Sequence, residues 1–513
     1  MSALARAFED FRAIVGEENV LVDDESTRAV ARATFPTTQT VPAIVRPGDT
    51  AQVRACVRVA REHHLPLYPI SRGRNIGYGS AVPVRSGCVV LDLARMARIL
   101  EVNEELAYVV LEPGVTLQQL HTHLREKGSR LFASVGGAVP DASIVGHALE
   151  RGIGRGPLGD RFGGVCNLEV VLGNGEVVET GFGRFPGARA SDVFRWSVGP
   201  YGDGLFTQSN FGVVTRMTVW LTPMPDHLET SFFRIDSSDR LGSLVEGIRE
   251  LRLRGIFRGP VLLANDCRIF SFDGQYPWSD TGGETPLPPP LRESMRRRLG
   301  VPAWGGDGAL YAYTAAQARA EREQVQDVLG PRVDRLEFVG EEQARNDPRR
   351  GWRDMNAGVP NARSLFPTYW RKRSAPPPDM DPHRDGVGIL WYAPALPATA
   401  GNALEVVQIV EEVCARHALE PNAGFQFANE RGLVMTGALF WDRTVEGEDE
   451  RAIACYGELR RRLDAAGYYP YRVSTASMGS LPECRAYDDV IRAVKQACDP
   501  DGIIAPDRYV LTP

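Results

Sequence analysis

Ser71-Arg72-Gly73-Arg74-Asn75-Ile76-Gly77-Tyr78-Gly79 is the segment of this 513-residue chain from which the other motifs can be interpreted. It follows 67–70, a short apolar run that predicts a strand. Three glycines and one asparagine among its nine residues allow positive φ at several points. Such a turn can direct successive backbone N–H groups into one concavity that suits a phosphate. Tyr78 adds a phenol that a purely structural turn does not need, so the segment predicts a phosphorylated cofactor with a phenol beside it.

Composition and charge narrow the class of protein. The apolar fraction of 43% and the charged fraction of 24% are ordinary for a globular chain. The net charge of −6 argues against a nucleic-acid partner, because phosphate binding needs a basic face. No apolar run reaches about 18 residues, so we expect no membrane span. The eight cysteines contain no C-x-x-C pair and no metal motif accompanies them, which favours a cytoplasmic protein with reduced thiols and no metal site.

The first 222 residues alternate short apolar runs with helical patterns. The expected strands are 41–45, 67–70, 88–93, 108–111, 168–172, 176–180 and 213–221. A helix is expected up to about His63 with Asp49 or Thr50 as its N-cap, and another over 117–127 with Thr116 as its cap. Gly173-Asn174-Gly175 between two strand patterns indicates a hairpin. These features predict an α+β fold.

From about residue 223 the pattern changes, and proline-rich loops appear at 286–290 and 376–378. Expected strands at 388–392 and 433–440 and expected helices at 403–417 and 450–466 form a second α+β unit. We therefore expect a cofactor-binding domain over 1–222, a cap or substrate domain over 223–484, and a C-terminal segment, 485–513, that completes the first domain.

Common nucleotide motifs are absent. The glycines of the 71–79 loop have the wrong spacing for G-x-G-x-x-G, and there is neither a P-loop nor a G-x-S-x-G motif. Taken alone, the loop is as compatible with a tight surface turn as with a binding site. Three further tracts favour binding: a glycine-rich tract over 143–160, a second over 204–215, and Asp499-Pro500-Asp501-Gly502 near the C-terminus.

Together these tracts resemble the vanillyl-alcohol oxidase / p-cresol methylhydroxylase family of FAD enzymes, and in particular its members that act on 4-hydroxybenzyl compounds. The resemblance covers nearly the whole chain and is densest over 41–221 and 467–508. It implies a p-cresol methylhydroxylase-type FAD-binding domain of two α+β subdomains, completed by the C-terminal segment, with an α+β cap domain that forms the substrate cavity.

The resemblance also implies which residues bind FAD. Residues 71 to 79 match the pyrophosphate loop of the family. The other matching positions are Ser143, Ile144, Val145 and Gly146 in a second flavin loop, Gly159 and Asp160 in a Gly-Asp pair, Ser209, Asn210, Gly212 and Val214 along the sheet, and Arg508. Arg508 stands where members carry a lysine near the N1/C2 edge of the flavin, and a cation there favours the anionic reduced flavin.

Three residues match the family's substrate clasp, in which two tyrosines and an arginine hold a phenolate oxygen: Tyr78, Tyr471 and Arg472. Two phenol donors and a guanidinium stabilise the phenolate and lower the pKa of a bound phenol. A phenolate makes hydride loss from the para benzylic carbon easier. On its own, Tyr471-Arg472 is as compatible with an exposed strand end as with a substrate clasp. The additional match of Tyr78 favours the clasp.

The chain departs from the family pattern at three places. The run that carries a flavin-tethering histidine in many members is Arg431-Gly432-Leu433-Val434-Met435 here, so we expect non-covalent FAD. The aspartate that oxidases place near flavin N5 corresponds to Ala138, and Asp141 is either a substitute or plain solvated surface. Arg155 and Arg161 lie in a motif that contains tyrosines in the family. These arginines either bind a more anionic substrate or support the structure around the site.

The leading hypothesis is an FAD-dependent oxidoreductase that oxidises a para-substituted phenol at its benzylic carbon by hydride transfer to flavin N5, through a p-quinone methide. A second hypothesis is oxidation of a carboxylate-bearing alcohol or hydroxy acid, with Arg155 and Arg161 binding the carboxylate. A third is a flavin-binding subunit that has lost turnover. The electron acceptor, O2 or an electron-transfer partner, stays open, as does assembly into a homodimer.

Overall fold

The computed structural model describes residues 3–137, 139–347 and 349–511. Its first sheet has the strand order β1-β2-β4-β3, in which β2 (Ile44–Val45) and β3 (Leu67–Ile70) run parallel to β4 (Val89–Asp92), and β1 (Val20–Leu21) is antiparallel at the edge. Helices α1 (Ala3–Val15) and α3 (Thr50–Glu62) share a buried core with this sheet. The side chain of Asp49 accepts a hydrogen bond from Gln52 N, which confirms the predicted N-cap of α3.

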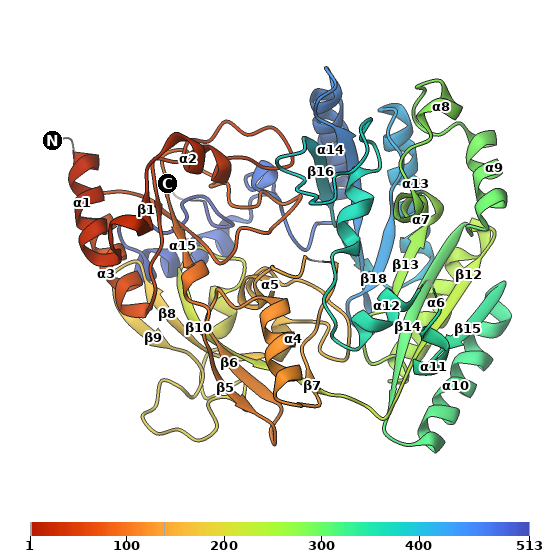
Figure 1. The fold of residues 1–513 in the computed structure, drawn as a ribbon, viewed down its shortest axis with the longest axis horizontal. Helices are drawn as coiled ribbons and strands as arrows, with labels where there is room; N and C mark the ends of the chain where they lie inside the picture. The colour runs from red at the N-terminus through yellow and green to blue at the C-terminus, as the bar shows by residue number, and fades with distance from the viewer. Residues whose placement is uncertain (1–2, 138, 348, 512–513) are drawn as a thin grey trace.

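The C-terminal segment joins this first sheet. Ile504 bridges to Leu67 of β3, and Ile503 and Ile504 are buried in the same core. Figure 1 shows α15 (Arg485–Cys498) among the first elements of the chain, far from its neighbours in sequence. The placement of this segment supports the expected division of the chain at 222 and 484, although these boundaries stay a prediction.

A second sheet is antiparallel, with the order β5-β6-β10-β8-β9. Its strands are β5 (Ile99–Asn103), β6 (Tyr108–Leu111), β10 (Gly212–Trp220), β8 (Val165–Leu172) and β9 (Val177–Glu179). Strands β8 and β9 form the predicted hairpin, with Gly175 at a φ of +84°. Helices α4 (Leu117–Glu126) and α5 (Ile144–Leu149) share a core with this sheet, and Thr116 caps α4 as predicted.

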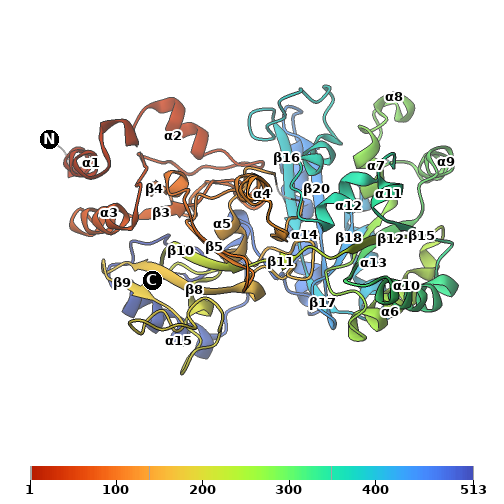
Figure 2. The same ribbon diagram turned by 60° about the horizontal axis from the view of Figure 1, so that its bottom comes forward.

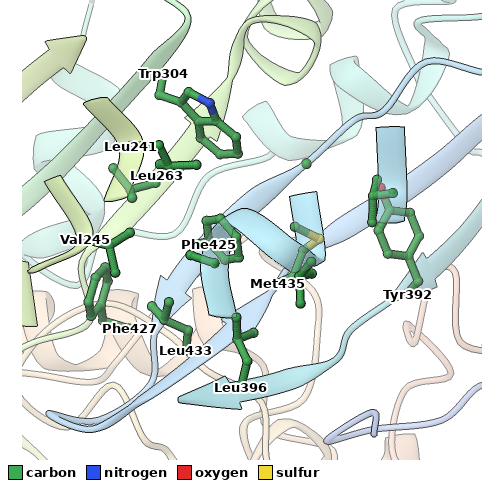
Figure 3. Packing of buried hydrophobic residues seen from close by; sticks show 14 of the residues in the cluster. Leu241, Val245, Leu263, Trp304, Tyr392, Leu396, Phe425, Phe427, Leu433 and Met435 are labelled. Atoms are coloured by element: carbon green, nitrogen blue, oxygen red, sulfur yellow. The ribbon is translucent and has the colours of Figure 1, made fainter. Parts of the chain in front are cut away.

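The cap contains a seven-stranded antiparallel sheet with the order β15-β12-β14-β13-β18-β19-β17. Its strands are β15 (Arg335–Val339), β12 (His227–Ile235), β14 (Trp304–Ala312), β13 (Leu262–Asn265), β18 (Gly424–Phe427), β19 (Gly432–Met435) and β17 (Ala395–Pro397). Helices α6 (Leu241–Leu253), α10 (Ala315–Leu329) and α13 (Ala400–Arg416) bury it in the largest core of the molecule, part of which is drawn in Figure 3. Figure 2 shows α7 (Asp266–Asp273) and α12 (Arg350–Asn356) on the other side of the sheet.

The prediction of a single strand over 433–440 in the cap was wrong. The run 433–440 forms two strands in different sheets, β19 and β20 (Gly437–Asp442), and β20 pairs with β16 (Val387–Tyr392). The chain changes sheets at Thr436, whose N–H donates to Gly424 O at 2.7 Å. A side chain at the next position would collide with Tyr392, because a Cβ on Gly437 would lie 1.9 Å from its ring. The break is therefore set by packing that the local apolar pattern does not contain.

Within the described ranges, no group of three or more His, Cys, Asp or Glu residues is placed to hold a metal ion. All eight cysteines are free, and six of them are buried. Among the described helices, none has the length and apolar character needed to cross a bilayer.

Candidate flavin and substrate site

The predicted cofactor residues meet at one cavity between the two sheets of the first unit and the C-terminal segment. Its walls include twelve of them: Ser71, Arg72, Gly73, Arg74, Asn75, Ser143, Gly146, Ser209, Asn210, Gly212, Val214 and Arg508. These residues come from four segments that are separated by up to several hundred positions in the sequence. Their convergence supports the interpretation of the glycine loop as part of a binding site and not as a surface turn.

The glycine loop has the backbone conformation that its sequence predicted. Gly73, Gly77 and Gly79 have φ of +63°, +79° and +117°. Two of these glycines are also required by close approach. A Cβ on Gly77 would lie 2.3 Å from the indole of Trp391, and a Cβ on Gly79 would lie 2.2 Å from the hydroxyl of Thr475. The loop therefore faces the cavity with its first half and packs against the cap side with its second half.

The remaining predicted cofactor residues do not line this cavity. Ile144 and Val145 are buried in the core under α5, and Ile76 is packed beside the cap core. Gly159 lies against Pro260, because a Cβ on it would come within 2.3 Å of that ring. Asp160 caps its own turn by accepting from Gly163 N at 3.2 Å. Direct contact of these residues with FAD stays a prediction.

Among the predicted substrate residues, Arg472 lines the cavity, the Tyr78 ring lies against its guanidinium, and Tyr471 directly precedes it in the chain. The guanidinium carbon of Arg472 lies 4.3 Å from the centroid of the Tyr78 ring. Arg472 Nη2 donates to Asn75 Oδ1 at 2.5 Å, which ties it to the glycine loop. Burial raises the pKa of Tyr78 well above its ordinary value, and the charge of Tyr471 adds to this while Arg472 opposes it. Tyr78 is thus a neutral hydrogen-bond donor at physiological pH, as a phenolate clasp requires.

Glu150, which directly follows α5, connects the two arginines of the site. Its carboxylate accepts from Arg472 Nε at 3.1 Å and from the Tyr509 hydroxyl at 2.8 Å, and it forms an ion pair with Arg508. Burial acts to raise the pKa of Glu150, but the charges of Arg508 and Arg472 outweigh it and lower that pKa to about 2. Nothing local in the sequence indicated this role, because the two arginines lie 322 and 358 positions away.

The two arginines that break the family pattern have different surroundings. Arg155 is buried and forms a two-pronged ion pair with Asp307 of β14, so it joins the FAD-binding unit to the cap sheet. Arg161 is also buried, and its Nη1 contacts His147 Nδ1 at 2.6 Å. Burial lowers the pKa of Arg161 to about 10 and that of His147 well below its usual range, so the imidazole is neutral. Among the described residues, Arg161 Nε and Nη2 have no hydrogen-bond partner.

Asp141 is engaged in a surface ion pair. Its Oδ2 accepts from Arg74 Nε at 2.7 Å. The side chains are 40% exposed for Asp141 and 42% exposed for Arg74. This arrangement favours the surface alternative for Asp141 over a role as base. The predicted replacement of the N5 aspartate falls on Ala138, which lies outside the described residues.

The charged groups and polar atoms of the cavity fit FAD. A Cβ on Gly146 would lie 3.3 Å from Ser71 Oγ, so the missing side chain keeps the loop and α5 in close contact beside the cavity. Arg72, Arg74 and Arg508 supply positive charge along its walls. The buried Asn210 Oδ1 lines the cavity and has no hydrogen-bond partner in the described part of the chain, so it can accept from a ligand.

Comparisons with known proteins agree with this site. Residues 41–181 match the model of the FAD binding domain family. The chain is 46% identical to 1'-carboxy-chondrochloren decarboxylase of Chondromyces crocatus over 99% of this chain and 97% of that protein. It is 31% identical to the flavoprotein subunit of 4-cresol dehydrogenase (hydroxylating) of Pseudomonas putida, over 98% of this chain and 95% of that subunit.

Two solved structures share the whole fold. The substrate-bound structure of p-cresol methylhydroxylase superposes with a TM-score of 0.91 at 30% identity, covering 99% of this chain and 97% of the other. The isoeugenol complex of 4-ethylphenol oxidase from Gulosibacter chungangensis also gives 0.91, at 27% identity, covering 100% and 98%. The cavity, its donors and these full-length similarities show that the chain is an FAD-dependent enzyme of the vanillyl-alcohol oxidase / p-cresol methylhydroxylase family.

Proposed function

We propose that this enzyme oxidises a para-substituted phenol at its benzylic carbon. The observation that supports the proposal is the contact of the Tyr78 ring with Arg472, which lines the flavin cavity, together with the charge interaction between Tyr78 and Tyr471. The full-length similarity to enzymes of 4-cresol and 4-ethylphenol supports the same substrate class.

The clasp prepares the substrate for loss of a hydride. Tyr78 and Tyr471 donate hydrogen bonds to the phenolic oxygen, and the charge of Arg472 stabilises the phenolate. Electron density from the phenolate then reaches the para carbon and favours departure of a benzylic hydride, which leaves a p-quinone methide. When bound, FAD supplies N5 as the hydride acceptor and Arg508 supplies a positive charge for its reduced form.

We expect FAD to be held without a covalent bond, because the 431–435 run contains neither histidine nor tyrosine at the tethering position. Acid precipitation of the purified enzyme should leave the yellow colour in the supernatant. A yellow pellet would show a covalent link at another position.

Anaerobic stopped-flow measurement of flavin reduction tests the function. 4-Alkylphenols and 4-hydroxybenzyl compounds should bleach the flavin, and Tyr471→Phe should slow that step by about tenfold or more because one phenolate donor is lost. Tyr469→Phe is the matched control, since Tyr469 is 47% exposed two positions away. Failure of a broad panel of phenols to reduce the flavin would rule the proposal out. In a separate aerobic assay, an oxygen electrode shows whether O2 is the electron acceptor.

A second candidate, oxidative decarboxylation of a phenol that carries a carboxylate, is favoured by the relative named as a decarboxylase of a carboxy compound. After hydride loss, the bond from the adjacent carbon to the carboxylate breaks. Its electron pair forms a C=C bond to the benzylic carbon, the ring becomes aromatic again, and CO2 leaves. This route needs no base, which agrees with alanine at position 138. Release of labelled CO2 from a carboxyl-labelled substrate would distinguish it from simple oxidation.

A further inference from the structure

We infer that the cavity on the cap sheet is a second part of the substrate site, in which Arg268 binds a carboxylate carried by the para substituent of the phenol. This inference rests on the proposed phenol oxidation and adds the chemical class of the substituent. Three features carry it: the walls of the cavity, the balance of charge among its arginines, and the connection from Arg268 to the loop that holds Tyr78.

The walls of the cavity suit an organic substituent. The cavity has a volume of about 590 Å³ and lies against strands β12, β13 and β14. Its apolar lining includes Phe232, Leu262, Ala264, Ile269, Phe272 and Trp352. The rings of Phe272 and Trp352 meet edge to face with centroids 5.0 Å apart. Arginine and carboxylate side chains make up half of the residues that line it, so the cavity offers an apolar wall beside charged groups that can orient a ligand.

Other arginines of this cavity are neutralised by carboxylates. Arg155 pairs with Asp307, and Arg349 pairs with Glu337 at 2.5 Å and with Asp347 at 2.7 Å. These guanidinium groups already have anionic partners, so they have little to gain from a ligand carboxylate. They also show that the cap neutralises buried positive charge where the fold requires it.

Arg268 differs from the arginines of this cavity that act on a carboxylate, which include Arg363 through its charge interaction with Asp273. In the part of the chain that the structure describes, it forms no ion pair with a carboxylate; its Nη1 donates to the carbonyl of Thr436, and its guanidinium carbon lies 5.7 Å from the centroid of the Trp391 ring. Burial lowers the pKa of Arg268 to about 10, so the side chain is charged at neutral pH. A half-buried cation with free donors on the wall of an apolar cavity favours an anionic ligand group.

Trp391 connects this cation to the phenol site. Its Nε1 donates to Ile76 O at 3.0 Å, and its ring occupies the space that a side chain on Gly77 would need. The loop that positions Tyr78 and the guanidinium of Arg268 therefore contact the same indole. Arg268 is therefore separated by one indole from the loop that carries Tyr78, and on this basis we assign it to a substituent that extends from the bound ring.

Equilibrium binding to the oxidised holoenzyme, followed by the change in the flavin spectrum, tests this inference. The probes are 4-hydroxyphenyl alkanoates of increasing chain length and their carboxamides, which have nearly the same shape without the charge. The wild type should bind at least one carboxylate about 10- to 100-fold more tightly than its amide, as expected for a hydrogen-bonded charge pair. Arg268→Gln should reduce this ratio to about one with little change for the amide, and Arg268→Lys should keep part of it.

The other outcomes are equally informative. Arg161→Gln is the comparison variant, because Arg161 is a buried arginine whose Nε and Nη2 have no hydrogen-bond partner among the described residues. Loss of the preference in Arg161→Gln and its retention in Arg268→Gln would overturn the assignment. Equal binding of carboxylates and amides by the wild type would overturn it too, while bleaching by 4-alkylphenols would leave the phenol proposal intact. If no phenol bound or reduced the flavin, both proposals would fail.

Discussion

The flavin cavity and the cap cavity are both lined by arginines, but they balance these charges differently. In the flavin cavity, Arg472 and Arg508 share the carboxylate of Glu150. In the cap cavity, Arg155 has its own carboxylate, whereas the partners of Arg268 within the described residues are a backbone carbonyl and an indole. In the proposed phenolate clasp, the charge of Arg472 is therefore balanced by the protein itself, whereas we infer a ligand as the partner of Arg268 in the cap cavity.

Removing the partner of Arg155 should produce the largest effect on the fold. Asp307→Asn leaves a buried guanidinium without its counterion, which is expected to lower the free energy of unfolding by about 3–5 kcal/mol. Urea denaturation of the holoenzyme measures this loss. Asp236→Asn is the matched control, because its carboxylate is 56% exposed and lies 3.8 Å from Arg234, and it should change stability by less than about 0.5 kcal/mol. Equal losses in the two variants would show that Arg155 does not depend on this pair.

Removing the cation of the phenolate clasp should produce the largest effect on the reaction. Arg472→Ala is expected to slow anaerobic flavin reduction by a saturating phenol by about 10²- to 10³-fold, the range seen when one preorganised donor to a developing anion is lost. FAD content and the flavin spectrum check that the cofactor site survives. If reduction slowed less than about threefold, the clasp would not act through Arg472.

Local chemistry in the sequence was enough to predict the helix caps at Asp49 and Thr116, the hairpin at Gly175 and the glycine loop, because each of these depends on neighbouring residues. The break at Thr436 was missed because it depends on the ring of Tyr392, which packs from another strand.

The sequence predicted those site residues that belong to recognisable motifs. Tyr78 and Arg472 are brought together as expected, 4.3 Å from ring centroid to guanidinium carbon. Glu150 and Arg268 could not be found in the same way, since their roles depend on partners at distant positions and, for Arg268, on the carboxylate it lacks. A sequence pattern does not show which charges the fold leaves unbalanced.

The shared carboxylate predicts a pH dependence of stability. The pKa of Glu150 falls from 4.5 to about 2 on folding, so its contribution is present above pH 4.5 and is lost as the pH falls toward 2. This contribution amounts to up to about 3 kcal/mol, at about 1.4 kcal/mol for each pKa unit. The free energy of unfolding of the wild type should therefore fall more steeply between pH 4.5 and 2 than that of Glu150→Gln. Parallel curves would mean that folding does not lower the pKa of Glu150.

The smallest effect is expected at Asp141, which pairs with Arg74 at the rim of the flavin cavity. The side chains are 40% exposed for Asp141 and 42% exposed for Arg74. Exposed ion pairs contribute less than about 1 kcal/mol, so Asp141→Asn should leave stability nearly unchanged. It should also change flavin reduction by less than about twofold, because a carboxylate held by a surface arginine does not serve as the base. If Asp141→Asn slowed reduction by about tenfold or more and removed an acidic limb from the pH profile, Asp141 would replace the missing aspartate, and the rim of the flavin cavity would be part of the catalytic machinery.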